Sequence, residues 1–273
     1  MTRDVVASLL AQDRLIDLVI PRGSNDLVRY VKDNTKIPVL GHADGICSAY
    51  LHSDADADIA IKVVVDSKTD YPAACNSLET LLVHQDCLET IFPKIAEALF
   101  TKRVCLRCDA PAKAALSKML PMIPDGLLQD ATDADYDTEF LDLILAVKTI
   151  TSTSQPSADI AEAIDHINLH SSGHTDVILT ASKQAADMFM NSIDSAGVFW
   201  NASTRFADGM RYGFGTEVGI STNKIHTRGP VGLDGLTIYK YMLRGEGHTA
   251  SDYHEGAGGK TWKHESLPVH NNS

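Results

Sequence analysis

The sequence predicts an α/β fold with an open sheet covered by helices. Short apolar runs such as 177–180 and 197–201 have the length of strands, and a helix-length segment over 158–167 precedes them. Repeated alternation of this kind is typical of strands joined by helices. With 273 residues, the chain can bury a full core and form one large or two modest domains.

The first 40 residues predict two helices and two strands. We expect a helix over 4–12, an apolar strand over 15–20, a helix over 25–33 and a second strand over 37–40. The turn 21–24, with the sequence Pro-Arg-Gly-Ser, joins the first strand to the second helix. A strand, a glycine turn and a helix together offer backbone N–H groups to a phosphate, although an ordinary turn is the alternative.

In residues 53–58, aspartates occur at every second position, a pattern that could indicate a calcium-binding loop. Such loops need a turn glycine and a distal bidentate acid, and neither follows at the right distance. We therefore expect a helix N-terminus with Ser53 or Asp54 as its cap. This helix is expected to continue through 59–65 and to lead toward Cys75.

Cys75 is the candidate nucleophile. It follows a polar turn, a proline and two alanines, and it precedes an apolar run suited to burial. A thiol presented in this way can attack an acyl group once its proton is removed. A buried structural cysteine is the alternative. The chain has an odd number of cysteines without the spacing of a small disulfide scaffold, which indicates reduced thiols: Cys47, Cys75, Cys87, Cys105 and Cys108.

Two patterns suggest metal ligands, and neither predicts a site. Cys105 and Cys108 lack a second pair of ligands at zinc spacing. His166, His170 and His174 are spaced by four, but a Ser-Ser-Gly sequence is expected to end a helix between the second and the third. We therefore expect no metal.

The bulk composition narrows the class of protein. A formal net charge of -12 and a pI near 5.3 argue against binding to nucleic acid or to anionic membranes, which favour a basic face. No run approaches the ~20 apolar residues of a membrane span, and the first residues lack the apolar core of a signal peptide. We expect a soluble protein of the cytoplasm.

Four ordered motifs resemble a known family. They are residues 16–24, residues 37–45, the segment around Cys75, and residues 215–232. From Ile16 to about Gly247, these motifs make the chain similar to the C-terminal half of gamma-glutamyl phosphate reductase, a member of the aldehyde dehydrogenase superfamily. The same enzyme forms the second domain of delta-1-pyrroline-5-carboxylate synthase.

The resemblance implies a reaction of proline biosynthesis. Cys75 attacks L-glutamyl 5-phosphate, phosphate leaves, and hydride from NADPH converts the thioester into L-glutamate 5-semialdehyde. Oxidative aldehyde dehydrogenases carry a water-activating glutamate in a Glu-Leu-Gly-Gly motif, and the corresponding residues 39–45 contain no glutamate. A reductase must avoid that hydrolysis. His42 and Asp44 in the same loop are alternative acid or base candidates.

The resemblance also implies which residues bind ligands. It places Arg22, Gly23 and Ser24 beside the phosphate and nicotinamide of the cofactor. It aligns Glu139 with the glutamate that holds the nicotinamide ribose, and a surface carboxylate is the alternative. The backbone N–H of Cys75 is a candidate oxyanion donor. The candidate substrate-binding residues are Asn76, Asn168, His174, Arg205 and Arg228. For the two arginines, structural ion pairing is an equal alternative.

The resemblance divides the chain into three expected parts. Residues 1–45 are the remnant of a dinucleotide-binding domain, 46–235 the catalytic domain, and 236–273 an oligomerisation strand and a loosely ordered tail. Residues 236–244 alternate like an exposed strand, whose edge another subunit would cover, so we expect a homo-oligomer.

Family members have a long N-terminal region ahead of the part that matches, and three explanations stay open. The chain is a fragment of a longer product, to which a glutamate 5-kinase domain and a mitochondrial or plastid targeting sequence could belong. Alternatively, a partner chain supplies the other half, or the chain is a catalytically incomplete paralogue that binds or regulates. In each case we expect this chain alone to bind NADPH poorly.

Overall fold

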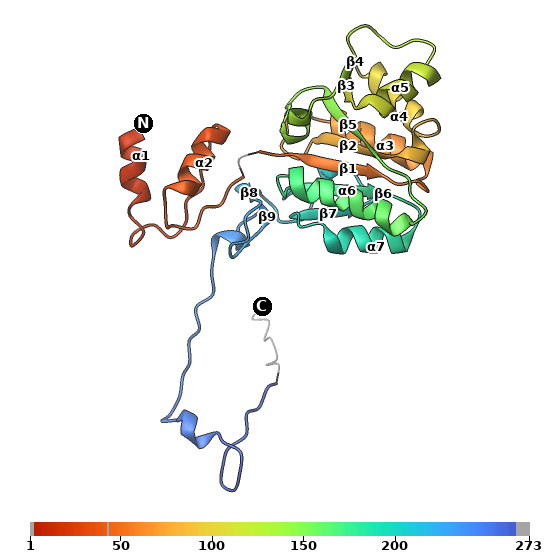
Figure 1. The fold of residues 1–273 in the computed structure, drawn as a ribbon. Helices are drawn as coiled ribbons and strands as arrows, with labels where there is room; N and C mark the ends of the chain where they lie inside the picture. Colours follow the sequence, from red (N-terminus) through yellow and green to blue (C-terminus); the bar gives the residue numbers. More distant parts are fainter. Residues whose placement is uncertain (1–2, 43, 266–273) are drawn as a thin grey trace. The chain divides into compact units, whose positions relative to one another are not determined.

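A parallel sheet of seven strands is the main element of the structure (Figure 1). The computed structural model describes residues 3–42 and 44–265. The strands follow the order β4-β3-β5-β2-β1-β6-β7, and every neighbouring pair is parallel. The expected α/β fold is confirmed. The strands are Cys47–Leu51 (β1), Leu78–His84 (β2), Cys105–Cys108 (β3), Leu128–Asp130 (β4), Ile144–Ile150 (β5), Thr175–Leu179 (β6) and Gly197–Trp200 (β7).

Helices cover both faces of this sheet (Figure 1). The helices α3, α4 and α5 pack on one face, and α6 and α7 pack on the other. Parallel strands need such crossover helices, so the sheet is buried on both sides. The helices are Arg3–Leu10 (α1), Asn25–Asp33 (α2), Ala57–Thr69 (α3), Phe92–Thr101 (α4), Ala110–Met119 (α5), Pro156–His170 (α6) and Lys183–Ser192 (α7).

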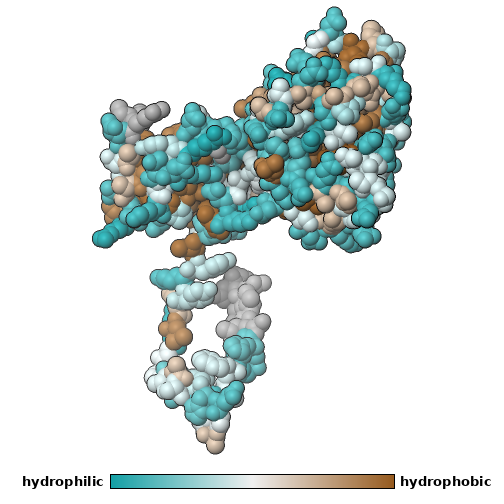
Figure 2. Space-filling view, viewed as in Figure 1, coloured by the Kyte–Doolittle hydropathy of each residue, from teal (hydrophilic) through white to brown (hydrophobic). Residues whose placement is uncertain are grey.

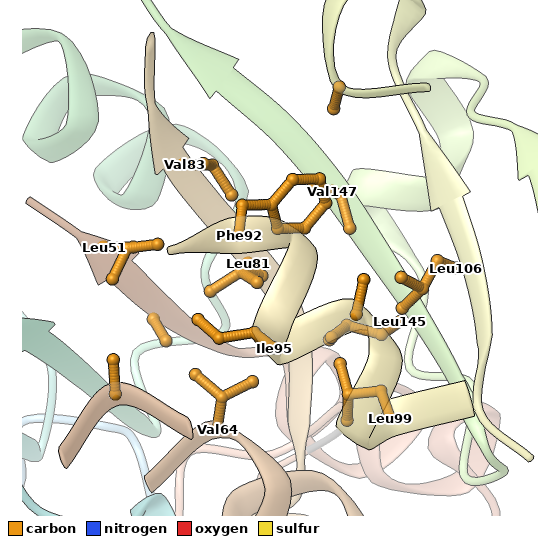
Figure 3. Packing of buried hydrophobic residues seen from close by; sticks show 14 of the residues in the cluster. Leu51, Val64, Leu81, Val83, Phe92, Ile95, Leu99, Leu106, Leu145 and Val147 are labelled. Carbon is orange, nitrogen blue, oxygen red and sulfur yellow. The ribbon is translucent and has the colours of Figure 1, made fainter. Parts of the chain in front are cut away.

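Side chains alternate between the two faces along the central strands. In β1, Tyr50 packs with the α6–α7 layer, whereas Leu51 belongs to the core under α3, α4 and α5. Figure 3 shows Phe92 and Ile95 of α4 next to Leu81 of β2. Each fully buried side chain of this size stabilises the fold by about 1.5–3 kcal/mol. The packed sheet therefore gives the strand ends fixed positions.

The first 40 residues contain the two expected helices but not the two expected strands. The segments 15–20 and 37–40 meet through one parallel bridge in the described chain, between Val19 and Val39. Both valines pack with apolar residues of α1 and α2. The prediction of strands was therefore wrong, because these valines pack against helices and the two segments form a single bridge in place of a continuous ladder.

The acidic stretch 53–58 begins a helix, as expected, but with a different cap. The carboxylate of Asp56 accepts a hydrogen bond from the backbone N–H three residues later (2.9 Å), and α3 follows it. The prediction of Ser53 or Asp54 as the cap was wrong. Asp54 instead binds the ring of His52 (Oδ1–Nδ1 2.6 Å).

The chain divides into two compact units after Thr237. In the first unit, the short strands Gly219–Ser221 (β8) and Gly229–Val231 (β9) pair antiparallel. The strand expected over 236–244 is not formed, because no described segment pairs with it. Tyr239 and Tyr241 there are more than nine-tenths exposed. The domain boundary that the sequence predicted at residue 45 stays a prediction.

The visible surface of the first unit is mixed in polarity. Figure 2 shows apolar side chains (brown) on the sheet region as separate patches among polar ones (teal). The described helices are all too short or too polar to span a bilayer.

Candidate active site

The candidate site lies at the amino ends of four neighbouring strands. In sheet order these strands are β5, β2, β1 and β6. The segments that lead into them carry Leu141, Cys75, Gly45 and His174, respectively. Parallel strands begin at the same edge of a sheet, so these lead-in segments lie side by side. Residues far apart in the sequence therefore meet at one edge.

Hydrogen bonds hold the turn that carries Cys75 between α3 and β2. The next residue, Asn76, is buried, and its amide donates to the carbonyl of Ala207 (3.0 Å). The guanidinium of Arg205 contacts the side-chain oxygen of Asn76 and binds Asp70 (Nε–Oδ2 3.1 Å). These contacts agree with the ion-pair alternative for Arg205. Asn76, which the sequence suggested for the substrate, uses its side chain to hold the turn.

Gly45 lets the backbone pass directly against Cys75. A Cβ added at Gly45 would lie 2.2 Å from the carbonyl oxygen of Cys75 and 2.6 Å from its Cα. Non-bonded atoms do not approach so closely, so another residue at this position must displace the turn. Sequence reasoning missed this role, because the two residues meet only in the folded chain.

The Cys75 thiol is half-buried and does not ionise by itself at neutral pH. Burial raises the pKa of Cys75 to about 12, and the carboxylates of Glu139 and Glu217 act in the same direction. Arg205 opposes these effects without overcoming them. A nucleophilic thiolate at this position therefore needs a neighbouring base.

Two imidazoles lie beside this thiol. The sulfur of Cys75 and one nitrogen each of His42 and His174 all lie within 4.8 Å of one another. The two rings meet edge to face, with centroids 5.4 Å apart. Burial lowers the pKa of His42, and it lowers the pKa of His174 to about 3. Both rings are therefore neutral at pH 7 and have a nitrogen lone pair to offer.

The hydrogen bonds of the loop distinguish the two acid or base candidates. Nδ1 of His42 lies 3.3 Å from the carbonyl oxygen of Ile220. A carbonyl can only accept, so Nδ1 carries the proton and Nε2 has the lone pair. Asp44 is instead tied to α2, through the amide of Asn25 (2.5 Å) and a contact with Arg29. Residue 43, between the two candidates, lies outside the described residues.

A pocket of about 310 Å³ opens beside Cys75. Arg22 and Gly23 line it, next to the start of α2, where the hydroxyl of Ser24 accepts a backbone N–H of the first turn (3.4 Å). Glu139 lines it too. Burial raises the pKa of Glu139 above its usual value, although hydrogen bonds oppose this effect. The pocket thus brings together the thiol and three of the four residues suggested for a cofactor, Arg22, Gly23 and Glu139.

Two of the expected substrate residues lie elsewhere. The amide of Asn168 donates to the carbonyl of Ser192 at the end of α7 (3.1 Å). Arg228 binds both the carboxylate and the carbonyl of Asp194 (3.1 and 2.8 Å). None of the five expected substrate residues is in the lining of the pocket beside Cys75. The ion-pair alternative for Arg228 agrees with these contacts.

The two spacing patterns considered for metals are separated by the fold. Cys105 and Cys108 lie three apart on the strand β3, so their side chains point to opposite faces. The helix α6 ends at His170, whose ring lies beside that of His166, with centroids 4.3 Å apart and the planes tilted by 38°. His174 lies beyond this helix end and contacts His42 instead.

Relatives match this chain over nearly all of its length. The probable gamma-glutamyl phosphate reductase of Schizosaccharomyces pombe is 57% identical over 270 residues, which are 99% of this chain and 58% of that protein. The chain is homologous to one part of gamma-glutamyl phosphate reductase. It spans somewhat more than half the length of the curated relatives it matches. The match therefore extends beyond the range Ile16 to Gly247 that the motifs indicated. No family model matches the chain.

Solved structures give the same result. The crystal structure of gamma-glutamyl phosphate reductase from Thermotoga maritima superposes with a TM-score of 0.81 and 39% identity, covering 91% of this chain and 56% of that one. An acetylating aldehyde dehydrogenase from Geobacillus thermoglucosidasius has a TM-score of 0.61 at 17% identity, covering 91% of this chain and 61% of that one. The second likeness concerns the fold alone. The expected aldehyde dehydrogenase-like fold is confirmed.

Proposed function

We propose that the protein carrying this chain reduces L-glutamyl 5-phosphate to L-glutamate 5-semialdehyde with NADPH, in proline biosynthesis. One observation carries the proposal. The Cys75 thiol lies in a pocket beside the neutral imidazole of His42, in a chain homologous to gamma-glutamyl phosphate reductase. A thiol with an adjacent base is the arrangement that nucleophilic acyl chemistry requires.

The first step uses Cys75 and His42. The thiol proton passes to Nε2 of His42 as the sulfur attacks the acyl carbon. The bond from that carbon to the phosphate oxygen then breaks, and phosphate leaves with the electron pair. The product is a thioester on Cys75. The backbone N–H of Cys75 is the proposed donor to the oxyanion that develops during the attack.

The proposed site of the nicotinamide cofactor is the other side of this pocket. Arg22, Gly23 and Ser24 would hold it at the start of α2, and Glu139 would accept a hydrogen bond from a ribose hydroxyl. Bound NADPH supplies the hydride that reduces the thioester carbonyl. The carbon–sulfur bond then breaks with its electrons on sulfur, and Cys75 takes back the proton held by His42.

The test is the phosphate dependence of the reverse reaction. The gene product that carries this chain should oxidise glutamate 5-semialdehyde with NADP⁺ only when phosphate is supplied. Cys75→Ala should lower this activity about 1,000-fold or more, because it removes the nucleophile. Cys105→Ala, which removes a thiol from β3, should leave it unchanged. Rapid oxidation to the free acid without phosphate would show that water attacks the thioester, and it would refute the proposal.

We also propose that the exposed segment 238–243 associates with a second copy of the protein. Its apolar side chains Ile238, Tyr239, Tyr241 and Leu243 are each more than three-quarters exposed. A segment of this kind is stabilised by pairing with a strand edge. Light scattering should find an oligomer, and Tyr241→Asp with Leu243→Asp should shift it to the monomer. A wild-type monomer would contradict this proposal.

A further inference from the structure

We propose that Cys75, His42 and His174 form a binding site for a thiophilic divalent cation, of which Zn²⁺ is the reference ion. When it is bound, the nucleophile is held in an unreactive form. The metal site itself stands on the geometry alone. Its inhibitory effect rests on the proposed function, because it assumes that Cys75 is the attacking group.

The distances fit a small tetrahedral ion. The three ligand atoms lie within 4.8 Å of one another. Zinc binds thiolate at about 2.3 Å and imidazole nitrogen at about 2.0–2.1 Å, so tetrahedral ligand atoms lie roughly 3.3–3.6 Å apart. Small movements of side chains close the difference. One thiolate and two imidazoles are ligands that zinc prefers to carboxylate oxygens, and they leave one position of the tetrahedron open.

A hydrogen bond to one ring nitrogen of His42 leaves the other nitrogen able to coordinate a metal. Its Nδ1–H donates to the carbonyl of Ile220 (3.3 Å), which leaves Nε2 free to coordinate. Metal-binding histidines almost always donate their second ring N–H in this way, because the hydrogen bond fixes the tautomer and the orientation of the ring.

His174 supplies an independent indication of a ligand. The residue is 1% exposed, and its Nε2 has no hydrogen-bond partner among the described residues. Its Nδ1 lies 2.9 Å from the hydroxyl of Thr175, which can accept the Nδ1 proton. Most buried polar atoms have a partner, so a bare nitrogen here calls for a species that the protein itself does not provide. A cation shared with Cys75 and His42 satisfies it.

The bound cation would block the acyl reaction in a defined way. Zinc replaces the proton on the Cys75 sulfur and releases that proton to solvent. A sulfur lone pair then coordinates the metal. The open fourth position of the ion is filled by water. Neither the thiol proton nor the free thiolate is available until the ion leaves, so inhibition is reversible by a chelator.

Cobalt(II) and zinc titrations of the purified protein test the site without any enzyme assay. Cobalt should bind with a thiolate-to-metal charge-transfer band that Cys75→Ser abolishes. Zinc should protect Cys75 from iodoacetamide, and a chelator should restore labelling. His42→Gln and His174→Gln should each weaken protection about 10- to 100-fold or more, because each removes a ligand. His42 is only partly buried, so its variant tests the site even if the His174 variant does not fold.

His166→Gln is the matched control. His166 is also buried with an unpartnered Nε2, but it lies on α6 next to His170. Its variant should keep full zinc protection of Cys75. The site is refuted if zinc fails to protect Cys75, or if the His166 variant loses as much affinity as the His42 variant. Reductase activity that persists in zinc-saturated protein would refute only the inhibitory effect. Absent activity with intact zinc binding would refute only the proposed function.

Discussion

Histidines gather at both ends of the central strands, and they have different neighbours at the two ends. At the carboxyl ends, the ring of His52 donates to Asp54 (2.6 Å), and His84 contacts Asp159 (3.2 Å). Nδ1 of His84 accepts a backbone N–H (3.2 Å), so its proton lies on Nε2 and is donated to Asp159. Each of these rings is thus held by a carboxylate.

At the amino ends, His42 and His174 face each other and the thiol of Cys75. No carboxylate holds either ring in the described hydrogen bonds, and burial keeps both rings neutral. The comparison shows how similar residues serve different purposes. The histidines at the carboxyl ends are each fixed by a carboxylate, whereas the two neutral histidines beside the thiol have no acid partner and leave a lone pair available for chemistry.

The position of the open site departs from a general expectation. In open α/β sheets, ligands usually bind outside the carboxyl ends of the strands. Here the nucleophile lies in the turn that enters β2, so the site forms at the amino ends instead.

The largest effect should come from Gly45→Ala. A methyl group there collides with the backbone of Cys75, so one of the two segments must shift and the position of the thiol relative to His42 and His174 must change. We expect the rate of Cys75 alkylation to fall about 10-fold or more, since misplacement by an ångström costs up to 100-fold in such sites. Mass spectrometry of the labelled protein measures this rate.

Gly126→Ala is the control for Gly45→Ala. Gly126 has a φ of +78° and nothing within 4 Å of an added Cβ. The substitution should cost stability through its backbone without changing the labelling of Cys75. An unchanged rate in the Gly45 variant would show that the close approach does not position the thiol.

A smaller effect, on stability alone, is expected at the carboxyl ends. Asp159→Ala leaves His84 and Thr153 without their buried acceptor, which should lower the free energy of unfolding by roughly 2–3 kcal/mol. Urea denaturation measures this change, and the labelling of Cys75 should stay the same. Slower labelling in a folded Asp159 variant would mean that the two ends of the sheet are coupled.

The same aspartate predicts how stability depends on pH. Burial acts to raise the pKa of Asp159, but hydrogen bonds from Thr153 and His84 lower it overall below its usual value. A carboxyl with a lowered folded-state pKa contributes stability above its unfolded pKa of about 3.9, and this contribution is lost as the pH falls through the folded pKa. The wild type should therefore have a higher free energy of unfolding than Asp159→Ala at neutral pH, and this difference should shrink below about pH 4. A constant difference down to pH 2 would contradict this assignment.

The smallest effect is expected from Glu139→Gln. The Glu139 carboxylate helps to raise the pKa of Cys75, so its neutral replacement should lower that pKa by a few tenths of a unit. Alkylation of Cys75 at pH 8 should then be about 2- to 5-fold faster. Slower alkylation would mean that Glu139 supports the thiolate.

The sequence alone was sufficient to predict an element where residues within that element determine its structure. The bounds of α2 were predicted correctly because its apolar face lies within the helix itself. The strands expected at 15–20 and 37–40 were not formed, because a strand depends on its neighbours as well as on its own residues. Cys75 was proposed as the nucleophile from its segment together with the family resemblance, and its catalytic role stays a prediction. The contact of Gly45 with its backbone could not be found, because only the sheet order brings the two together.

The most direct test of the central claim is a labelling ratio. Cys75 and Cys105 are both half-exposed, but the structure places imidazoles beside Cys75 alone of the two. Limited iodoacetamide treatment of the folded protein, followed by peptide mapping, should modify Cys75 before Cys105 and before the three buried cysteines. His42→Gln should remove this preference and leave the Cys105 rate unchanged. Earlier labelling of Cys105, or a preference for Cys75 that survives in the His42 variant, would contradict the account.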